Sequence, residues 1–125
     1  MQPDPRAAAF LWDALTFVRN VRVAVADTAL ETYLEGGPVA WATERQVELV
    51  SEALNNLRKV DPETASLVPD IRKIIGMRNV LVHGYTEVNN TIVWLAATKA
   101  IPALIPVLEA LLAEVAPSDR VTEAD

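Results

Sequence analysis

The sequence contains no cysteine and a single histidine, His83, among its 125 residues. Without cysteine there can be no disulfide, no thiol nucleophile and no cysteine-ligated zinc, a pattern that suits the reducing cytoplasm. One histidine also argues against a histidine-based metal site within one chain. We therefore expect neither a metal nor another cofactor.

Glycine is scarce, at four residues, and no Asn-Gly or Asp-Gly pair separates alternating strands. Long apolar runs are missing too, since no stretch approaches the roughly 18–20 residues that a membrane span needs. The first residues carry prolines and an aspartate, unlike a signal peptide. These absences predict an all-α cytoplasmic protein that makes no contact with a membrane.

What the chain does have is apolar surface and an uneven distribution of charge. Hydrophobic residues make up 51% of it and the mean hydropathy is +0.19, so part of its surface is expected to be covered in a homodimer. The net charge of −6 argues against broad, sequence-independent coating of nucleic acid. A local basic site remains open, because five basic residues lie within one short stretch: Arg58, Lys59, Arg72, Lys73 and Arg78.

Apolar residues recur at spacings of three and four, which predicts helices throughout. We expect a compact antiparallel bundle of about five helices over residues 1–116, followed by a flexible tail over residues 117–125. The expected elements are a helix from Pro5 with a break near Asp27–Thr28, a continuation ended by Gly36–Gly37–Pro38, a helix from Pro38 or Trp41 to Val60, a short helix begun by Asp61–Pro62, a helix over 71–82, and a last helix capped by Asn89–Asn90–Thr91 and kinked by Pro102 and Pro106.

The helix expected over residues 71–82 has an arginine where its periodicity calls for an apolar residue. At about 100° per residue, Arg78 falls in the middle of an apolar stripe. Burying an unpaired guanidinium is costly, so Arg78 should meet a partner, a ligand or a wet interface there. The stripe consists of Ile71, Ile74, Ile75, Leu81 and Val82.

A second face of this helix is polar. On this face a cation, a glycine, an amide and the imidazole lie within about 60° of one another around the helix axis. Such a surface is suited to binding an anion. Met77 and Val80 belong to neither face, which indicates a second contact surface. The polar face consists of Arg72, Gly76, Asn79 and His83.

Arg78 and His83 are five residues apart, hence roughly 140° apart on an ideal helix. They cannot converge on one small ligand unless the helix ends near Val82, where Gly84 could stop it, or a second chain intervenes. A two-fold dimer would bring two arginines and two histidines into one cleft. Such a cleft could cut RNA without metal, because histidine serves as acid or base and arginine holds phosphate.

From the residues alone, a structural interpretation stays open beside the catalytic one. A histidine near a helix C-terminus is favourable there as a cation. Arg78 could form a structural ion pair with Glu48 or Glu52.

The segment "RNVLVHGY", Arg78 to Tyr85, resembles the signature of the HepT-like toxins (formerly DUF86) of the HEPN superfamily. The similarity covers about residues 10 to 112, and it includes "LWDAL", "RQVELVSEALNNL", "MRNVLVHGY" and "IVW" in the family's order. Two departures stand out. Ser51-Glu52-Ala53 stands where the family usually has Gly-Glu-Ala, and Pro69-Asp70 stands where it usually has Pro-Trp.

The resemblance implies a dimeric helical bundle whose signature lines a cleft between subunits, and a metal-independent endoribonuclease of a toxin–antitoxin pair. It makes Arg78 and His83 catalytic, with Asn79 orienting the cleft. Tyr85 would be modified with AMP by a cognate MntA-like nucleotidyltransferase antitoxin. That adduct would place negative charge beside His83 and block the RNA substrate. A larger complex with the antitoxin is compatible with this interpretation.

Two other classes of function stay open. The chain could be a non-catalytic, nucleotide- or substrate-binding partner subunit of a nucleotidyltransferase, with binding that depends on Arg72 and Arg78. It could also be a structural protein that docks a partner through its acidic surface.

Overall fold

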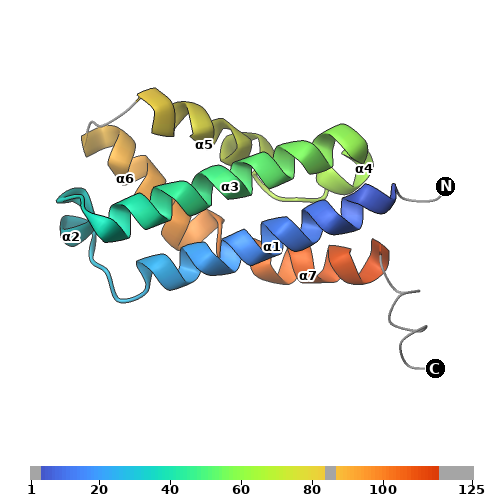
Figure 1. The fold of residues 1–125 in the computed structure, drawn as a ribbon, viewed down its shortest axis with the longest axis horizontal. Helices are drawn as coiled ribbons and strands as arrows, with labels where there is room; N and C mark the ends of the chain where they lie inside the picture. The colour runs from blue at the N-terminus through green and yellow to red at the C-terminus, as the bar shows by residue number, and fades with distance from the viewer. Residues whose placement is uncertain (1–3, 84–86, 116–125) are drawn as a thin grey trace.

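The computed structural model describes residues 4–83 and 87–115, except for the side chains of residues 82, 83, 87 and 88. Within these ranges the chain forms α-helices and one π-helical segment and contains no strand (Figure 1), which confirms the all-α prediction. The elements are α1 (Pro5–Val25), α2 (Leu30–Leu34), α3 (Pro38–Val60), α4 (Pro62–Ala65), α5 (Ile71–His83), α6 (Glu87–Leu95), the π-helical η1 (Ala96–Ala100) and α7 (Leu104–Val115).

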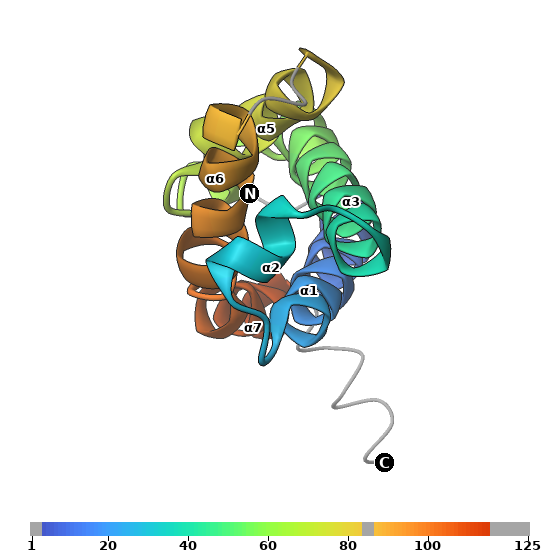
Figure 2. The same cartoon turned by 90° about the vertical axis from the view of Figure 1, so that its left-hand side faces the viewer.

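The helices surround one core. α1 and α3 lie antiparallel along the length of the molecule, with α7 against α1 and α5 against α3 (Figure 1). Seen end-on, α5, α3, α1, α7 and α6 form a ring, and α2 lies across one end of it (Figure 2). This arrangement places α5 at the edge of the bundle, where it touches α3 and α6.

The predicted helix boundaries rest on local capping chemistry. The Asp61 side chain accepts a hydrogen bond from the backbone N–H of Thr64 at 3.1 Å, so it caps the short α4 as expected. The break after α1 is confirmed and is marked by Asp27, whose φ of 60° leaves the helical region. Gly36 and Gly37, with φ of 82° and 101°, then turn the chain into α3.

The start of the last helix was predicted wrongly. α6 begins at Glu87, not at a cap formed by Asn89–Asn90–Thr91. The expected kink is confirmed at Pro102, where the axes of segments 89–100 and 104–115 differ by 56°. Pro106 lies within the first turn of α7 and does not interrupt it. Gly84 and the tail over residues 117–125 lie outside the described residues.

The core is almost wholly apolar. Only two polar residues, Thr43 and Ser51, are buried among the described residues. The bundle is tied at its surface by an ion pair between Arg19 and Glu109 at 2.7 Å. The largest fully buried side chains are Leu11, Leu54, Leu57, Ile74, Ile101, Leu104, Leu108, Val18, Val21, Val47, Val50 and Val93.

No single helix in the described part of the chain is long and apolar enough to cross a membrane. Segments 89–100 and 104–115 reach that length and hydropathy only when taken together across their bend.

Candidate functional site

Helix α5 is anchored to the bundle by its apolar residues. Ile74 is buried, and Ile75 is half-buried against the core. Met77 and Val80, which we expected to mark a second contact surface, pack partly against the core of this same chain. Each of the two side chains is only half-buried, so the second contact surface expected there stays a prediction.

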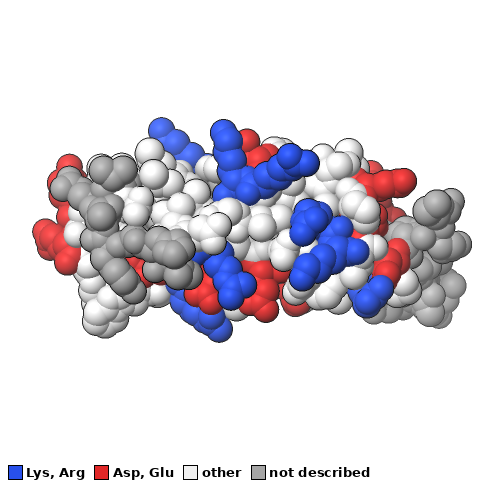
Figure 3. Space-filling model, turned by 90° about the horizontal axis from the view of Figure 1, so that it is seen from above, with Lys and Arg blue, Asp and Glu red and all other residues white. Residues whose placement is uncertain are grey.

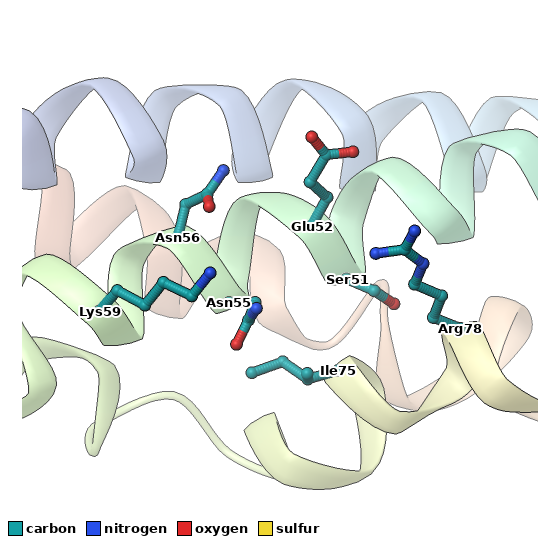
Figure 4. Close-up of a pocket in the computed structure, with 7 residues that line it drawn as sticks. All are labelled: Ser51, Glu52, Asn55, Asn56, Lys59, Ile75 and Arg78. Atoms are coloured by element: carbon teal, nitrogen blue, oxygen red, sulfur yellow. The ribbon is translucent and has the colours of Figure 1, made fainter.

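Arg78 lies at the edge of the contact between α5 and α3, and it is exposed. Its side chain extends from α5 toward α3 (Figure 4) and lines a groove of about 270 Å³. The helical periodicity placed Arg78 in the middle of the apolar stripe, whereas its side chain is exposed at the edge of the contact with α3. Of the three surroundings expected for its guanidinium, a partner, a ligand or a wet interface, this exposed position corresponds to the last. The groove is lined by Ser51, Glu52, Asn55, Asn56, Lys59, Ile75 and Arg78.

A buried hydroxyl group joins the two helices one turn before Arg78. The Ser51 hydroxyl lies 2.6 Å from the carbonyl oxygen of Ile74 and 3.0 Å from that of Val47, and it can donate to either. In a regular helix the Ile74 carbonyl also accepts the N–H of Arg78. Ser51 therefore fixes the turn of α5 that carries Arg78 against α3.

The guanidinium of Arg78 forms no ion pair with any acidic residue that the structure describes. Glu48 pairs instead with Arg45 at 3.1 Å. The structural ion pair of Arg78 with Glu48 or Glu52 is thus not formed. Since the groove also contains Lys59, its lining carries two cations and one carboxylate, that of Glu52. Figure 3 shows basic side chains gathered over the middle of the α5 face, with acidic ones among them and toward the ends.

The polar face predicted on α5 is present but separate from the groove. Arg72, Gly76 and Asn79 are all exposed, and none of them lines the groove with Arg78. A Cβ atom added at Gly76 would meet nothing within 4 Å, so the surface there is open. His83 is the last residue of α5. Its side chain lies outside the described residues, as does Tyr85.

Apart from Lys59 as part of a possible basic site, the contribution of α3 to this groove was not predicted. Asn55, Asn56 and Lys59 line the groove, and Asn55 is held in place by Arg58. The Nε and Nη2 atoms of Arg58 donate to its Oδ1 atom at 3.2 Å and 2.9 Å. A signal was available, because polar residues recur along one side of the predicted helix, at positions 51, 52, 55, 56 and 59.

A second polar feature lies where α2 meets α6. The rings of Tyr33 and Trp94 are 5.3 Å apart at 41°. The Tyr33 hydroxyl is buried and has no hydrogen-bond partner among the described residues. Burial, together with the negative charge of Glu44, raises the pKa of Tyr33 well above its usual range, and burial also raises the pKa of Glu44.

No group of three or more His, Cys, Asp or Glu side chains in the described ranges is placed to hold a metal ion.

Comparison with known proteins supplies the family. The chain is 37% identical over 76 residues to Putative RNase TTE0752 of Caldanaerobacter subterraneus subsp. tengcongensis, covering 61% of this chain and 67% of that protein. It is 28% identical over 102 residues to Putative RNase MJ0125 of Methanocaldococcus jannaschii, covering 82% and 87%. Putative RNase MJ1216 of the same organism is 25% identical over 118 residues, covering 94% and 97%. No solved structure matches the chain.

The family model described as "Ribonuclease HepT-like" matches residues 14–111, which include α3, α5 and the whole groove. Because this match spans most of the helical bundle, the chain belongs to the HepT-like ribonuclease family.

Proposed function

We propose that the protein is a metal-independent endoribonuclease in which Arg78 and His83 are the catalytic residues. The observation that supports this most directly is Arg78 itself, an arginine without an ion-pair partner among the described residues, set in a polar groove. A guanidinium in that position is free to hold a phosphate bidentately. Membership of the family supports the choice of RNA as the substrate.

The proposed reaction is an attack of the RNA 2′-oxygen on the adjacent phosphorus. A base takes the 2′-hydroxyl proton, an acid gives a proton to the departing 5′-oxygen, and the products are a 2′,3′-cyclic phosphate and a 5′-hydroxyl. A histidine serves each proton transfer because its pKa lies near neutrality. Arg78 stabilises the negative charge that builds on the phosphate.

Two chains are needed for this reaction, because each chain supplies only one histidine. We propose a cytoplasmic homodimer that pairs two copies of α5, so that two Arg78 and two His83 residues share one cleft. Arg72, Gly76 and Asn79 would then support RNA along the exposed face of α5.

We further propose that the nuclease is the toxin of a toxin–antitoxin pair. A cognate nucleotidyltransferase antitoxin would add AMP to Tyr85 and so place phosphate charge beside the catalytic histidine. Incubation with ATP and that antitoxin should add the mass of AMP to Tyr85, and Tyr85→Phe should abolish the addition. Unmodified Tyr85 in the co-expressed complex would contradict this regulation and leave the nuclease proposal intact.

The nuclease is tested by RNA cleavage in the presence of a chelator. We expect Arg78→Ala to lower the cleavage rate about 10²–10³-fold, as loss of one charge-stabilising donor does. His83→Ala should lower it about 10²–10⁴-fold. Arg22→Ala is the matched control, because Arg22 is an exposed arginine on α1, and it should cleave at the normal rate.

Wild-type cleavage by either active-site variant, with its dimer intact, would show that the assigned roles are wrong. RNA or nucleotide binding without any cleavage by the purified wild type would favour the alternative function, a non-catalytic partner subunit of a nucleotidyltransferase.

A further inference from the structure

We propose that the groove between α3 and α5 holds two successive phosphates of one RNA strand, one at Arg78 and the next at Lys59. This inference rests on the proposed function for its substrate class. It assigns a second phosphate-binding residue on α3, a helix to which the proposed catalytic residues do not belong.

Lys59 and Arg78 come from different helices and point toward one another. The Lys59 side chain runs along α3 toward Asn55, and the Arg78 guanidinium reaches from α5 to the level of Ser51 (Figure 4). Both side chains are exposed, and neither forms an ion pair with a residue that the structure describes. Because like charges that face each other repel, the groove favours a ligand that brings negative charge between them.

The wall of α3 between the two cations offers a hydrogen-bond donor. The Oδ1 atom of Asn55 already accepts two hydrogen bonds from Arg58, at 3.2 Å and 2.9 Å. The Nδ2 group of Asn55 is therefore the part of its amide left for a ligand. The one carboxylate of the groove lining, that of Glu52, points to the other side of α3 from Asn55 (Figure 4). The side that faces Ile75 thus presents positive charge and a donor, which suits the oxygens of a phosphate.

The length of the groove fits two phosphates better than one. Lys59 and Ser51 are eight residues apart, about 12 Å along the axis of α3, and Lys59 reaches back over part of this length. Ser51 in turn contacts the Ile74 carbonyl, in the turn of α5 that leads to Arg78. The volume of about 270 Å³ falls just below the range of roughly 300–1,000 Å³ usual for small-molecule sites. A lone phosphate would leave most of that space empty, whereas a ribose with a phosphate on either side would occupy it.

The experiment measures binding, so that it does not depend on catalysis. The probes are triuridylates with 2′-O-methyl groups, which cannot be cleaved and which contain two phosphates. In two further probes one phosphate or the other is replaced by a methylphosphonate, which keeps the sugars and bases and removes one charge. We expect the wild type to bind the doubly charged probe about tenfold more tightly than either singly charged probe, as loss of one hydrogen bond between charged groups implies.

Three variants assign this preference to Lys59. Lys59→Ala should lower the ratio of affinities to less than about twofold, because only screened attraction from more distant charges then remains. Lys59→Arg restores a cation of similar reach and should keep most of the preference. Lys99→Ala is the matched control, since Lys99 is an exposed lysine on η1, outside the groove, and should keep the preference in full.

Cleavage kinetics provide a second measurement. A phosphate contact away from the reacting bond binds the substrate and the transition state alike. Lys59→Ala should therefore raise KM about tenfold and leave kcat within about twofold of the wild type. An equal fall in kcat would overturn the assignment, because it would place Lys59 at the phosphate that reacts.

The outcomes of the binding assay separate this inference from the proposed function. Equal binding of all three probes by the wild type overturns it, since both cations would then share one phosphate. A preference that survives Lys59→Ala, or that Lys99→Ala removes as well, also overturns it, as does the absence of binding to any probe. A preference lost only in Lys59→Ala supports the second phosphate site, and it does so even if the purified protein cleaves no RNA.

Discussion

The two sides of α3 make different kinds of contact, one apolar and one polar. Toward α1, the contact consists of apolar side chains without exposed surface, such as Val18 and Val50, and a hydrogen bond between Asn20 and Gln46 at 3.2 Å lies at its edge. Toward α5, the helices are joined by the hydroxyl of Ser51 and then leave a polar groove. One helix thus serves the core on one side and the candidate site on the other.

Stability and function can therefore be assigned to different faces of α3. The contact of α1 with α3 excludes water and supplies the hydrophobic stabilisation of the bundle. Apart from Ser51 and Ile75, the groove residues are polar and at least partly exposed, so they contribute little to folding and are free to bind a ligand. Substitutions on the two sides should therefore have opposite signatures in stability and activity assays.

The largest effect on stability is expected from the side of α3 that forms the core. Leu54 is fully buried, and Leu54→Ala removes apolar contacts and leaves a cavity. Substitutions of this kind cost about 2–5 kcal/mol, which we expect as a loss in the free energy of unfolding measured with urea. Arg78→Ala, on the groove side, should change that free energy by less than about 0.5 kcal/mol. Comparable losses in the two variants would contradict the separation of the faces.

Much of the fold was predictable because its signals are local. Asp61 followed by proline predicted α4, and the paired glycines at positions 36 and 37 predicted the turn into α3. The site was only half predictable. Periodicity singled out Arg78, but the identity of its neighbours depends on how α3 packs against α5, a contact between residues distant in sequence. Met77 shows the same limit: its side chain packs partly against the core, and a helical wheel cannot say which side of a helix a neighbouring helix will cover.

Substitution of Tyr33 should change the free energy of unfolding less than Leu54→Ala does, and in the opposite direction. Its hydroxyl is buried without a partner among the described residues, so Tyr33→Phe should raise the free energy of unfolding by about 1 kcal/mol at neutral pH. Burial raises the pKa of Tyr33, so the unfolded chain loses this proton first as the pH rises past about 10. Folding stability should therefore fall above that pH in the wild type and fall less steeply in the variant. Urea denaturation of the wild type and the variant at pH 7 and pH 10.5 measures the gain in stability and its dependence on pH. An equal fall in the free energy of unfolding of the two proteins would exclude this tyrosine as the cause.

Ser51 tests the connection between the two faces. Ser51→Ala removes the hydroxyl between α3 and α5, a loss of about 0.5–1.5 kcal/mol for one hydrogen bond. The cleavage rate should fall as well, because the turn that carries Arg78 is no longer fixed. Thr43→Val is the control, since it also removes a buried hydroxyl, but one that donates to Val39 within α3. It should affect stability alone, and an equal loss of cleavage in both variants would remove Ser51 from the site.

The smallest effect is expected at Gly76, on the exposed face of α5. Glycine within a helix is about 1 kcal/mol less favourable than alanine, and an added Cβ would meet nothing within 4 Å. Gly76→Ala should therefore raise the midpoint of thermal unfolding by a few degrees. If RNA approaches the backbone here, the same methyl group should weaken binding and lower the cleavage rate, so that the variant becomes more stable and less active. A variant that gains stability at full activity would show that RNA does not touch this face, and would leave the groove around Arg78 as the place where α5 meets its substrate.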